Sequence, residues 1–214
     1  MLEPKKEKNG SVEINAVYDM PQLNSEYLMT YQIDGTGKID LTASFSKTDK
    51  NAEIPELARF GISIPMPQSM SISRFYGRGP VENYSDRKSG AFIGEYTLAS
   101  SEQAHPYVRP QETGTKSDIR WWVQEDKGGR GIKIASGMPF YASATDYSIE
   151  SLDNGDEKTQ RHFNEVEKAD FVSLLIDSEQ AGVGGINSWG AKPLPPYRMK
   201  GEDRTLHFVI SPIM

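Results

Sequence analysis

The stretch Glu26-Tyr27-Leu28-Met29-Thr30-Tyr31-Gln32-Ile33 is followed by Asp34-Gly35-Thr36-Gly37-Lys38 and then by Ile39-Asp40-Leu41-Thr42-Ala43-Ser44-Phe45-Ser46. Apolar and polar residues alternate through both flanks. Successive side chains of a β-strand point to opposite faces, so a period of two indicates a strand with one buried face. A short connection rich in Asp and Gly between two such runs is typical of a β-hairpin. This stretch therefore predicts two antiparallel strands with one face in water.

The same pattern recurs outward in both directions along the chain. The further strand candidates, separated by Gly and Pro, are 12–18, 60–64, 70–76, 91–98, 119–124, 132–135, 171–176 and 206–210. Pro65 and Pro67 are expected to end the 60–64 strand, because proline has no N–H for a sheet ladder. Only 148–152 and 159–167 are candidates for helix. Many short strands and almost no helix predict an all-β fold, an antiparallel β-sandwich.

Length, charge and cysteine content limit the organisation and the partners. The 214 residues suffice for one domain, which we place at 11–214 behind a flexible charged lead at 1–10. The net charge of −6, with both signs interspersed, gives no reason to expect nucleic acid or an anionic membrane as partner. With no cysteine, disulfides and thiolate metal sites are excluded. The chain has neither a bilayer-spanning apolar run nor a signal-peptide core, so we expect a soluble protein, cytoplasmic or periplasmic, and leave open whether it forms an oligomer.

A glycine-rich stretch near the C-terminus holds the best candidate for ligand contact. It reads Gly182-Val183-Gly184-Gly185-Ile186-Asn187-Ser188-Trp189-Gly190. We expect the glycines to adopt positive φ values and to present Trp189 at the tip of a turn. An indole has a flat apolar face and one N–H donor, and both suit a sugar ring. A tryptophan folded back into the core explains the same residues equally well.

Charged residues gather in two loops near the middle of the chain, at 74–87 and 107–121. Gly77-Arg78-Gly79 has a superficial likeness to a phosphate-binding loop. However, Pro80 removes an amide donor and no strand-to-helix unit follows, so we reject a dinucleotide site. Forked pairs between arginines and carboxylates are the favoured explanation. We predict a structural polar network of six residues: Arg78, Glu82, Asp86, Arg87, Glu112 and Arg120.

The carboxylates of these loops are poor candidates for glycoside hydrolysis. A retaining glycosidase needs two carboxyl groups about 5 to 5.5 Å apart, one of them with a raised pKa. Glu82, Asp86 and Glu112 each lie near arginines in the sequence, and a neighbouring guanidinium lowers the pKa of a carboxyl group. The three histidines lie far apart without a second ligand at metal-binding spacing. We therefore expect no catalytic residue, no metal and no cofactor in this chain.

Several of these motifs occur in an order that resembles a known family. The C-terminal module of the large bacterial β-galactosidases, in glycoside hydrolase family 2, is similar at Arg78-Gly79-Pro80, Glu82-Asn83-Tyr84, Asp86-Arg87, Tyr107-Val108, Pro110, Glu112 with Gly114, Arg120-Trp121 and Gly184-Gly185 with Ser188-Trp189. The similarity runs from about Ser25 to the C-terminus. The resemblance implies a β-supersandwich of the galactose mutarotase-like type. Because the similarity begins inside the module, we expect the first strands of the supersandwich to be missing.

The resemblance also implies that this chain is one domain of a larger enzyme that hydrolyses terminal β-D-galactosides, and that another domain carries the catalytic residues. In that family the acid/base and nucleophile glutamates lie on a separate (β/α)₈ barrel, and the C-terminal module sends a tryptophan loop into the barrel's pocket. The implied partners are therefore a galactoside or other carbohydrate and the barrel of the parent chain. The implied contacts to substrate come from Trp189, with Asn187 and Ser188 beside it; Asn187 stands where an acidic residue is common.

Two other functions are open to a chain of this kind. A stand-alone aldose mutarotase or epimerase would use histidines with a carboxylate as acid and base, and no such set coincides with the matched motifs. A stand-alone carbohydrate-binding module would need only the stacking surface. The sequence does not separate the binding module from the β-galactosidase module.

Overall fold

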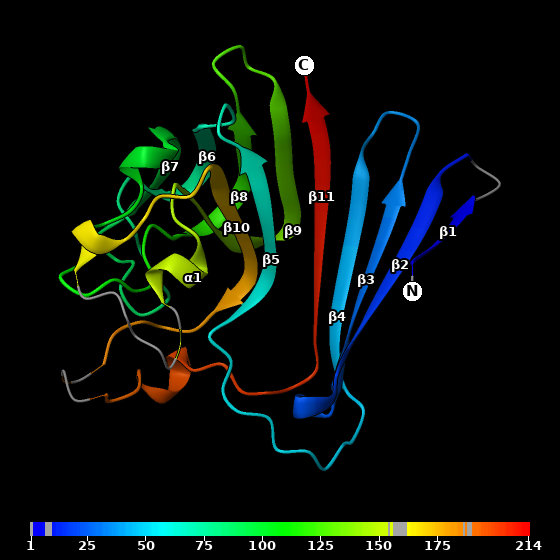
Figure 1. Cartoon of the computed structure of the whole chain (residues 1–214), viewed down its shortest axis with the longest axis horizontal. Coiled ribbons are helices and arrows are strands. Elements are labelled where there is room, and N and C mark those ends of the chain that lie inside the picture. The colour runs from blue at the N-terminus through cyan, green and yellow to red at the C-terminus, as the bar shows by residue number, and fades with distance from the viewer. Residues whose placement is uncertain (1, 7–9, 154, 156–161, 186, 188–189) are drawn as a thin grey trace.

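The computed structural model describes residues 2–6, 10–153, 155, 162–185, 187 and 190–214, and these form a protein made almost entirely of β-strands (Figure 1). The strands are β1 (Leu2–Lys6), β2 (Val12–Met20), β3 (Ser25–Ile33), β4 (Ile39–Lys47), β5 (Arg59–Pro67), β6 (Ile72–Gly79), β7 (Phe92–Ala99), β8 (Lys116–Glu125), β9 (Gly131–Thr145), β10 (Phe171–Gln180) and β11 (Arg204–Ile213). The helices are α1 (Ile149–Leu152) and the 3-10 turns η1 (Pro21–Leu23), η2 (Ser100–Glu102), η3 (Phe163–Glu165) and η4 (Pro195–Tyr197). No described helix is long and apolar enough to cross a membrane.

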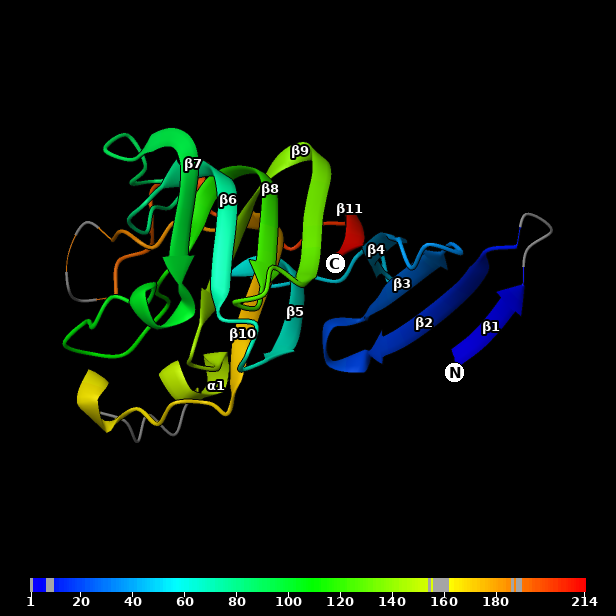
Figure 2. The same cartoon turned by 90° about the horizontal axis from the view of Figure 1, so that it is seen from above.

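The described strands all pair antiparallel, and β9 connects two parts of the sheet. The order along the main path is β1-β2-β3-β4-β11-β9-β8-β6-β7. Residues 131–135 of β9 pair with β11, whereas residues 141–145 pair with β10, which in turn pairs with β5. The long strand β9 thus belongs to both layers of the sandwich. Figure 2 shows β1, β2 and β3 extending away from the body formed by β5 to β11. The predicted antiparallel all-β sandwich is confirmed.

The core is filled by inward-facing side chains of alternating strand positions. Leu41, Ala43 and Phe45 of β4 are buried, as the alternation in the first hairpin predicts. Phe75 of β6 and Trp122 of β8 are fully buried and stack with ring centroids 4.8 Å apart. Aromatic side chains bury the largest areas of all residues, so this stack anchors the packing between the strands.

Two segments are more regular than the sequence predicts. Residues 2–6 form a strand paired with β2, in place of the expected flexible lead. A ladder satisfies backbone donors and acceptors whatever the side chains are, so a charged run can form an edge strand. β5 runs through Pro65 and Pro67 instead of ending before them. In the described chain β5 pairs with β10 alone, and an edge strand tolerates prolines that a central strand does not.

Candidate functional site

The backbone that leads into the predicted tryptophan loop is held at two points. The N–H of Gly182 donates to the carbonyl of Tyr197 at 2.7 Å. The N–H of Gly184 donates to Oδ2 of Asp86, also at 2.7 Å. One bond comes from η4, which follows the loop, and the other from the charged loop that precedes β7. The position at which the loop leaves the sandwich is therefore fixed by one segment that precedes the loop in the sequence and one that follows it.

The glycines of this stretch are needed for close approach more than for positive φ. A Cβ on Gly182 would lie 2.5 Å from the Asp86 carboxylate, and a Cβ on Gly185 would lie 2.4 Å from the carbonyl oxygen of Ala191. Neither space accommodates a side chain. The positive φ that the sequence suggested for the stretch occurs at Gly190, with φ of +84°.

The tip of the loop falls partly outside the described residues. Ile186, Ser188 and Trp189 are not described, and Asn187 is exposed. On the far side of the loop, Lys192 pairs with Glu56 at 2.7 Å. Contacts of Trp189, Ser188 and Asn187 with a sugar therefore stay a prediction.

Glu82 lies at the centre of one polar cluster. Its Oε1 accepts hydrogen bonds from Nη2 of Arg87 at 2.6 Å and from the Tyr107 hydroxyl. Its Oε2 accepts from the N–H of Gly114 at 2.7 Å and from the Thr113 hydroxyl at 3.1 Å. Burial acts to raise the pKa of Glu82, but the hydrogen bonds from Gly114, Tyr107 and Arg87 hold that pKa below its usual range. Glu82 is thus a charged acceptor that joins the loop before β7 to the loop before β8.

Glu82→Gln is expected to lower the free energy of unfolding at pH 7 by about 2 to 3 kcal/mol, because an amide replaces a charged acceptor that is 10% exposed. A carboxyl whose folded pKa is depressed stabilises the fold above its unfolded pKa of about 4.3 and loses that effect as pH falls through the folded pKa. The two proteins should therefore converge in acid. Denaturant titrations from pH 7 to pH 3 measure this, with Glu95→Gln on the exposed part of β7 as control. A Glu82→Gln variant as stable as Glu95→Gln at pH 7 would contradict the role of Glu82.

A second cluster forms where β5 and β10 pair. Nε and Nη2 of Arg59 donate to Oδ2 of Asp177 at 3.1 and 2.8 Å, and Nη1 donates to Oε2 of Glu112 at 3.1 Å. Asp177 sits opposite Gly61 in the ladder, and a Cβ on Gly61 would lie 2.2 Å from Oδ1 of Asp177. Burial raises the pKa of Asp177 to about 6 against the opposing attraction of Arg59. Strand periodicity and the charged loops do not point to Arg59 or Asp177. The signal present in the sequence is a charged residue within or beside an apolar strand.

A third cluster surrounds Asp118. Its carboxylate accepts from Nε of Arg78 at 2.5 Å and from Nζ of Lys88 at 2.9 Å. Arg120 donates to the backbone carbonyl of Asp118, and its guanidinium lies 5.6 Å from the centre of the Tyr76 ring. This cluster ties β6 to β8 through charged side chains at their ends.

The six residues predicted as one network are thus distributed among several groups. Glu82 and Arg87 pair directly with each other. Glu112 pairs with Arg59, and Arg78 pairs with Asp118. The remaining two contact backbone, Asp86 at Gly184 and Arg120 at Asp118. In the described part of the chain, no group of three or more His, Asp or Glu side chains is placed to hold a metal ion.

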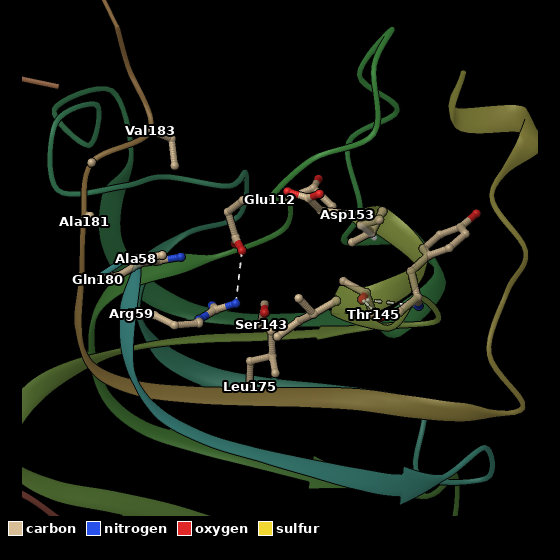
Figure 3. Close-up of a pocket in the computed structure, with 15 residues that line it drawn as sticks. Ala58, Arg59, Glu112, Ser143, Thr145, Asp153, Leu175, Gln180, Ala181 and Val183 are labelled. Carbon is tan, nitrogen blue, oxygen red and sulfur yellow. Dashed lines mark hydrogen bonds and ion pairs between the residues drawn. The ribbon is translucent and has the colours of Figure 1, made fainter. Parts of the chain in front are cut away.

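A cavity of about 230 Å³ lies between the Arg59 cluster and the base of the loop (Figure 3). Arg59, Glu112 and Gln180 line one end, and Thr145 lines the other. Val183, in the first part of the loop, forms part of the wall. The arrangement offers hydrogen-bond donors and acceptors to a small molecule.

Comparisons with known proteins identify relatives of this chain. The family described as "Beta galactosidase small chain" matches residues 2–210. A β-galactosidase from Lactobacillus delbrueckii subsp. bulgaricus is 35% identical over 212 residues, covering 97% of this chain and 20% of that protein. A β-galactosidase from Priestia megaterium is 34% identical over 186 residues, covering 86% of this chain and 17% of that protein. The chain thus spans about a fifth of the length of these relatives.

A solved structure shares the fold. A GH36 α-galactosidase from Geobacillus stearothermophilus aligns with a TM-score of 0.50 at 12% identity, covering 96% of this chain and 24% of that one. The family match begins at residue 2, earlier than the resemblance at about Ser25, so β1 and β2 lie within the matched region. Because the family match spans nearly the whole sequence, the chain belongs to the β-galactosidase small chain family.

Proposed function

We propose that this chain acts as the C-terminal module of an enzyme that hydrolyses terminal β-D-galactosides, and that its part is to support a catalytic barrel and to supply Trp189 to the sugar pocket. The observation that carries the proposal is the anchored base of the loop. Gly182 and Gly184 are held by 2.7 Å hydrogen bonds, while residues 183–185 are exposed. A loop whose backbone is anchored at Gly182 and Gly184, and whose residues 183–185 are exposed, is suited to contact a partner domain.

A loop whose base is anchored also has an energetic advantage. Ordering a mobile segment costs free energy that is subtracted from the affinity for the ligand. The bonds to Asp86 and Tyr197 supply part of that order before any sugar binds. Under this proposal the acid/base and nucleophile carboxylates belong to the barrel, and the carboxylates of this chain hold its loops together.

In the enzyme that contains this chain, Trp189→Ala is expected to raise KM by more than it lowers kcat, with a loss of roughly 1 to 3 kcal/mol of contact. Trp189→Phe should retain part of the affinity, because a smaller ring still stacks. Steady-state kinetics with chromogenic β-galactosides of different aglycone size measure both effects. Trp121→Ala, which removes a tryptophan from β8, is the matched control.

An unchanged KM in Trp189→Ala for substrates with bulky aglycones would overturn the stacking role. The aldose mutarotase alternative is tested separately by polarimetry of freshly dissolved α-D-galactose with the chain alone. Rotation that decays faster than in buffer would favour that alternative over the proposed module.

A further inference from the structure

One edge of β5 has no partner strand in the described chain. β5 pairs with β10 along its other edge, from Pro67 opposite Phe171 to Arg59 opposite Gln180. An unpaired edge presents a row of backbone N–H and C=O groups to which another chain segment can bind. Figure 2 shows β5 on the side of the body that faces β2 and β3. The open edge of β5 therefore lies next to the part of the sheet that extends from the body.

The odd-numbered residues of β5 point their backbone groups to this open edge. The carbonyl of Phe60 accepts from the hydroxyl of Ser178, on β10, at 3.1 Å. The carbonyl of Gly61 instead accepts from the Tyr27 hydroxyl, on β3, at 3.3 Å. Backbone groups alternate in direction along a strand of an antiparallel pair. The N–H groups of Gly61 and Ser63 therefore face away from β10.

The prolines of β5 agree with this direction. Pro65 and Pro67 continue the odd-numbered series, so their missing N–H groups would face the open edge and cost no hydrogen bond to β10. The same prolines limit the part of the open edge that can donate hydrogen bonds to residues 59–63.

A pocket of about 610 Å³ lies against this part of the edge. Residues 59–63 form one wall, and Tyr18, Tyr27 and Phe45 contribute to the opposite wall. Tyr18 lies opposite Tyr27 in the β2–β3 ladder, and Tyr27 lies opposite Phe45 in the β3–β4 ladder, so the three rings share one face of the sheet. Tyr18 is 52% exposed. The open strand edge is thus accompanied by an apolar surface that is accessible to a partner.

The other face of the same strands is polar. Asn15 donates to Oε1 of Glu13 at 3.0 Å, and the Thr30 hydroxyl donates to Oδ1 of Asn15 at 2.7 Å. An antiparallel sheet with one apolar and one polar face buries the apolar face against another layer. In β2 and β3 the apolar face is the one on the pocket side, and exposed apolar surface of this kind marks contact with another protein segment.

The strand edge distinguishes a polypeptide from a small ligand. Size alone does not, because ligand pockets span about 300 to 1,000 Å³. N–H and C=O groups spaced along an extended backbone match a second extended backbone, as in β-strand addition. This chain covers 20% and 17% of the two β-galactosidases described above, which leaves about four-fifths of each outside the match. The proposed role as one module of a longer chain supplies such a segment, and this inference rests on that part of the proposed function.

We propose that the open edge of β5 accepts an additional strand, an extended segment from another part of the parent chain. The segment pairs with Gly61 and Ser63 and places alternate apolar side chains against Tyr18, Tyr27 and Phe45. Backbone hydrogen bonds position it, and the pocket selects apolar side chains at every second position. The added strand extends the layer of β10 and β5 over the apolar face of β2 and β3. The module is thereby joined to the rest of the enzyme through a shared sheet, at a site separate from the tryptophan loop.

Amide hydrogen exchange at single-residue resolution, measured by mass spectrometry, tests the proposal in the 214-residue chain and in the enzyme that contains it. In the chain alone, the N–H groups of Gly61 and Ser63 should exchange faster than those of Ile62 and Ile64, which face β10. In the enzyme, Gly61 and Ser63 should exchange at least about tenfold more slowly than in the chain alone, because a paired N–H exchanges only when its ladder opens.

Ser63→Pro removes one N–H from the open edge and no hydrogen bond to β10. The isolated chain should keep its melting temperature, because Pro65 and Pro67 already occupy equivalent positions of the strand. In the enzyme, the variant should return the exchange of Gly61 to the rate measured in the chain alone. Ser63→Ala keeps the N–H and changes only an exposed side chain, so this matched control should behave as the wild type in both proteins.

Several results would overturn the proposal. One is equal exchange of Gly61 and Ser63 in the chain and in the enzyme, and another is equal protection of Gly61 in Ser63→Pro and Ser63→Ala. A lower melting temperature of the isolated Ser63→Pro chain than of Ser63→Ala would show that this N–H bonds within the module. Protection in the isolated chain that increases with protein concentration would show that a second copy pairs with β5. None of these measurements uses β-galactoside hydrolysis or the tryptophan loop, so failure of the strand addition and failure of the proposed enzyme function are separable.

Discussion

Arg59→Leu is expected to lower the free energy of unfolding at pH 7 by about 3 to 5 kcal/mol, the loss typical of breaking a buried ion pair. The guanidinium makes two hydrogen bonds to Asp177, whose side chain is 3% exposed. Leucine fills much of the space but offers no donor, so the carboxylate of Asp177 is left in a low-dielectric site or must take up a proton. Urea denaturation measures the change, provided that the wild type and the variant have the same m-value.

The exposed pair between Arg130 and Asp126 supplies the control. Arg130 is 75% exposed, and such pairs contribute less than about 1 kcal/mol, so Arg130→Leu should change stability little. The double variant Arg59→Leu with Asp177→Leu should recover much of the loss, because it removes the buried carboxylate together with its partner. The third charge of the cluster, Glu112, has a side chain that is 27% exposed and keeps its hydrogen bond from the Thr115 hydroxyl. If Arg59→Leu lowers the free energy of unfolding no more than Arg130→Leu does, the pair between Arg59 and Asp177 does not stabilise the sandwich in the way described.

Lys116 should make the stability rise between pH 7 and pH 9 by about 2 kcal/mol. This lysine is buried at the start of β8, and its Nζ donates to Oε1 of Gln103 at 2.9 Å and to the carbonyl of Gly114 at 2.7 Å. Burial lowers its pKa to about 7, with an opposing effect of Glu82. Between that value and the unfolded pKa of about 10.4, the unfolded state binds the extra proton, so stability rises with pH.

The free energy of unfolding is measured from pH 6 to pH 9 for the wild type and for Lys116→Met. The difference between the two proteins reports the contribution of the Lys116 titration. Methionine has a side chain of similar length to lysine but no titrating group. The difference should shift in favour of the wild type as the pH rises above 7. Lys127→Met, in the exposed turn between β8 and β9, should follow the wild type at every pH. A difference that is constant with pH would show that Lys116 is not held with a lowered pKa.

The sequence by itself determined the fold class, because strand alternation is a local property. The alternation in β3 and β4 and the Asp34–Gly37 turn need no information from distant residues, and the structure has the hairpin where the pattern predicts it. The pairing of Glu82 with Arg87 is also local, since five residues separate them. The order of several motifs was sufficient to indicate the family, which the match over residues 2–210 shows.

Only the tertiary structure decided which distant residues meet. Arg59 and Asp177 are 118 residues apart, and the register of β5 against β10, with a shift between Asp177 and Glu179, brings them together. The same register sets Gln180 opposite Arg59 and leaves its oxygen buried. Periodicity predicts that a strand has a buried face, but it does not predict the partner strand or the register, and these depend on the packing of the whole sandwich.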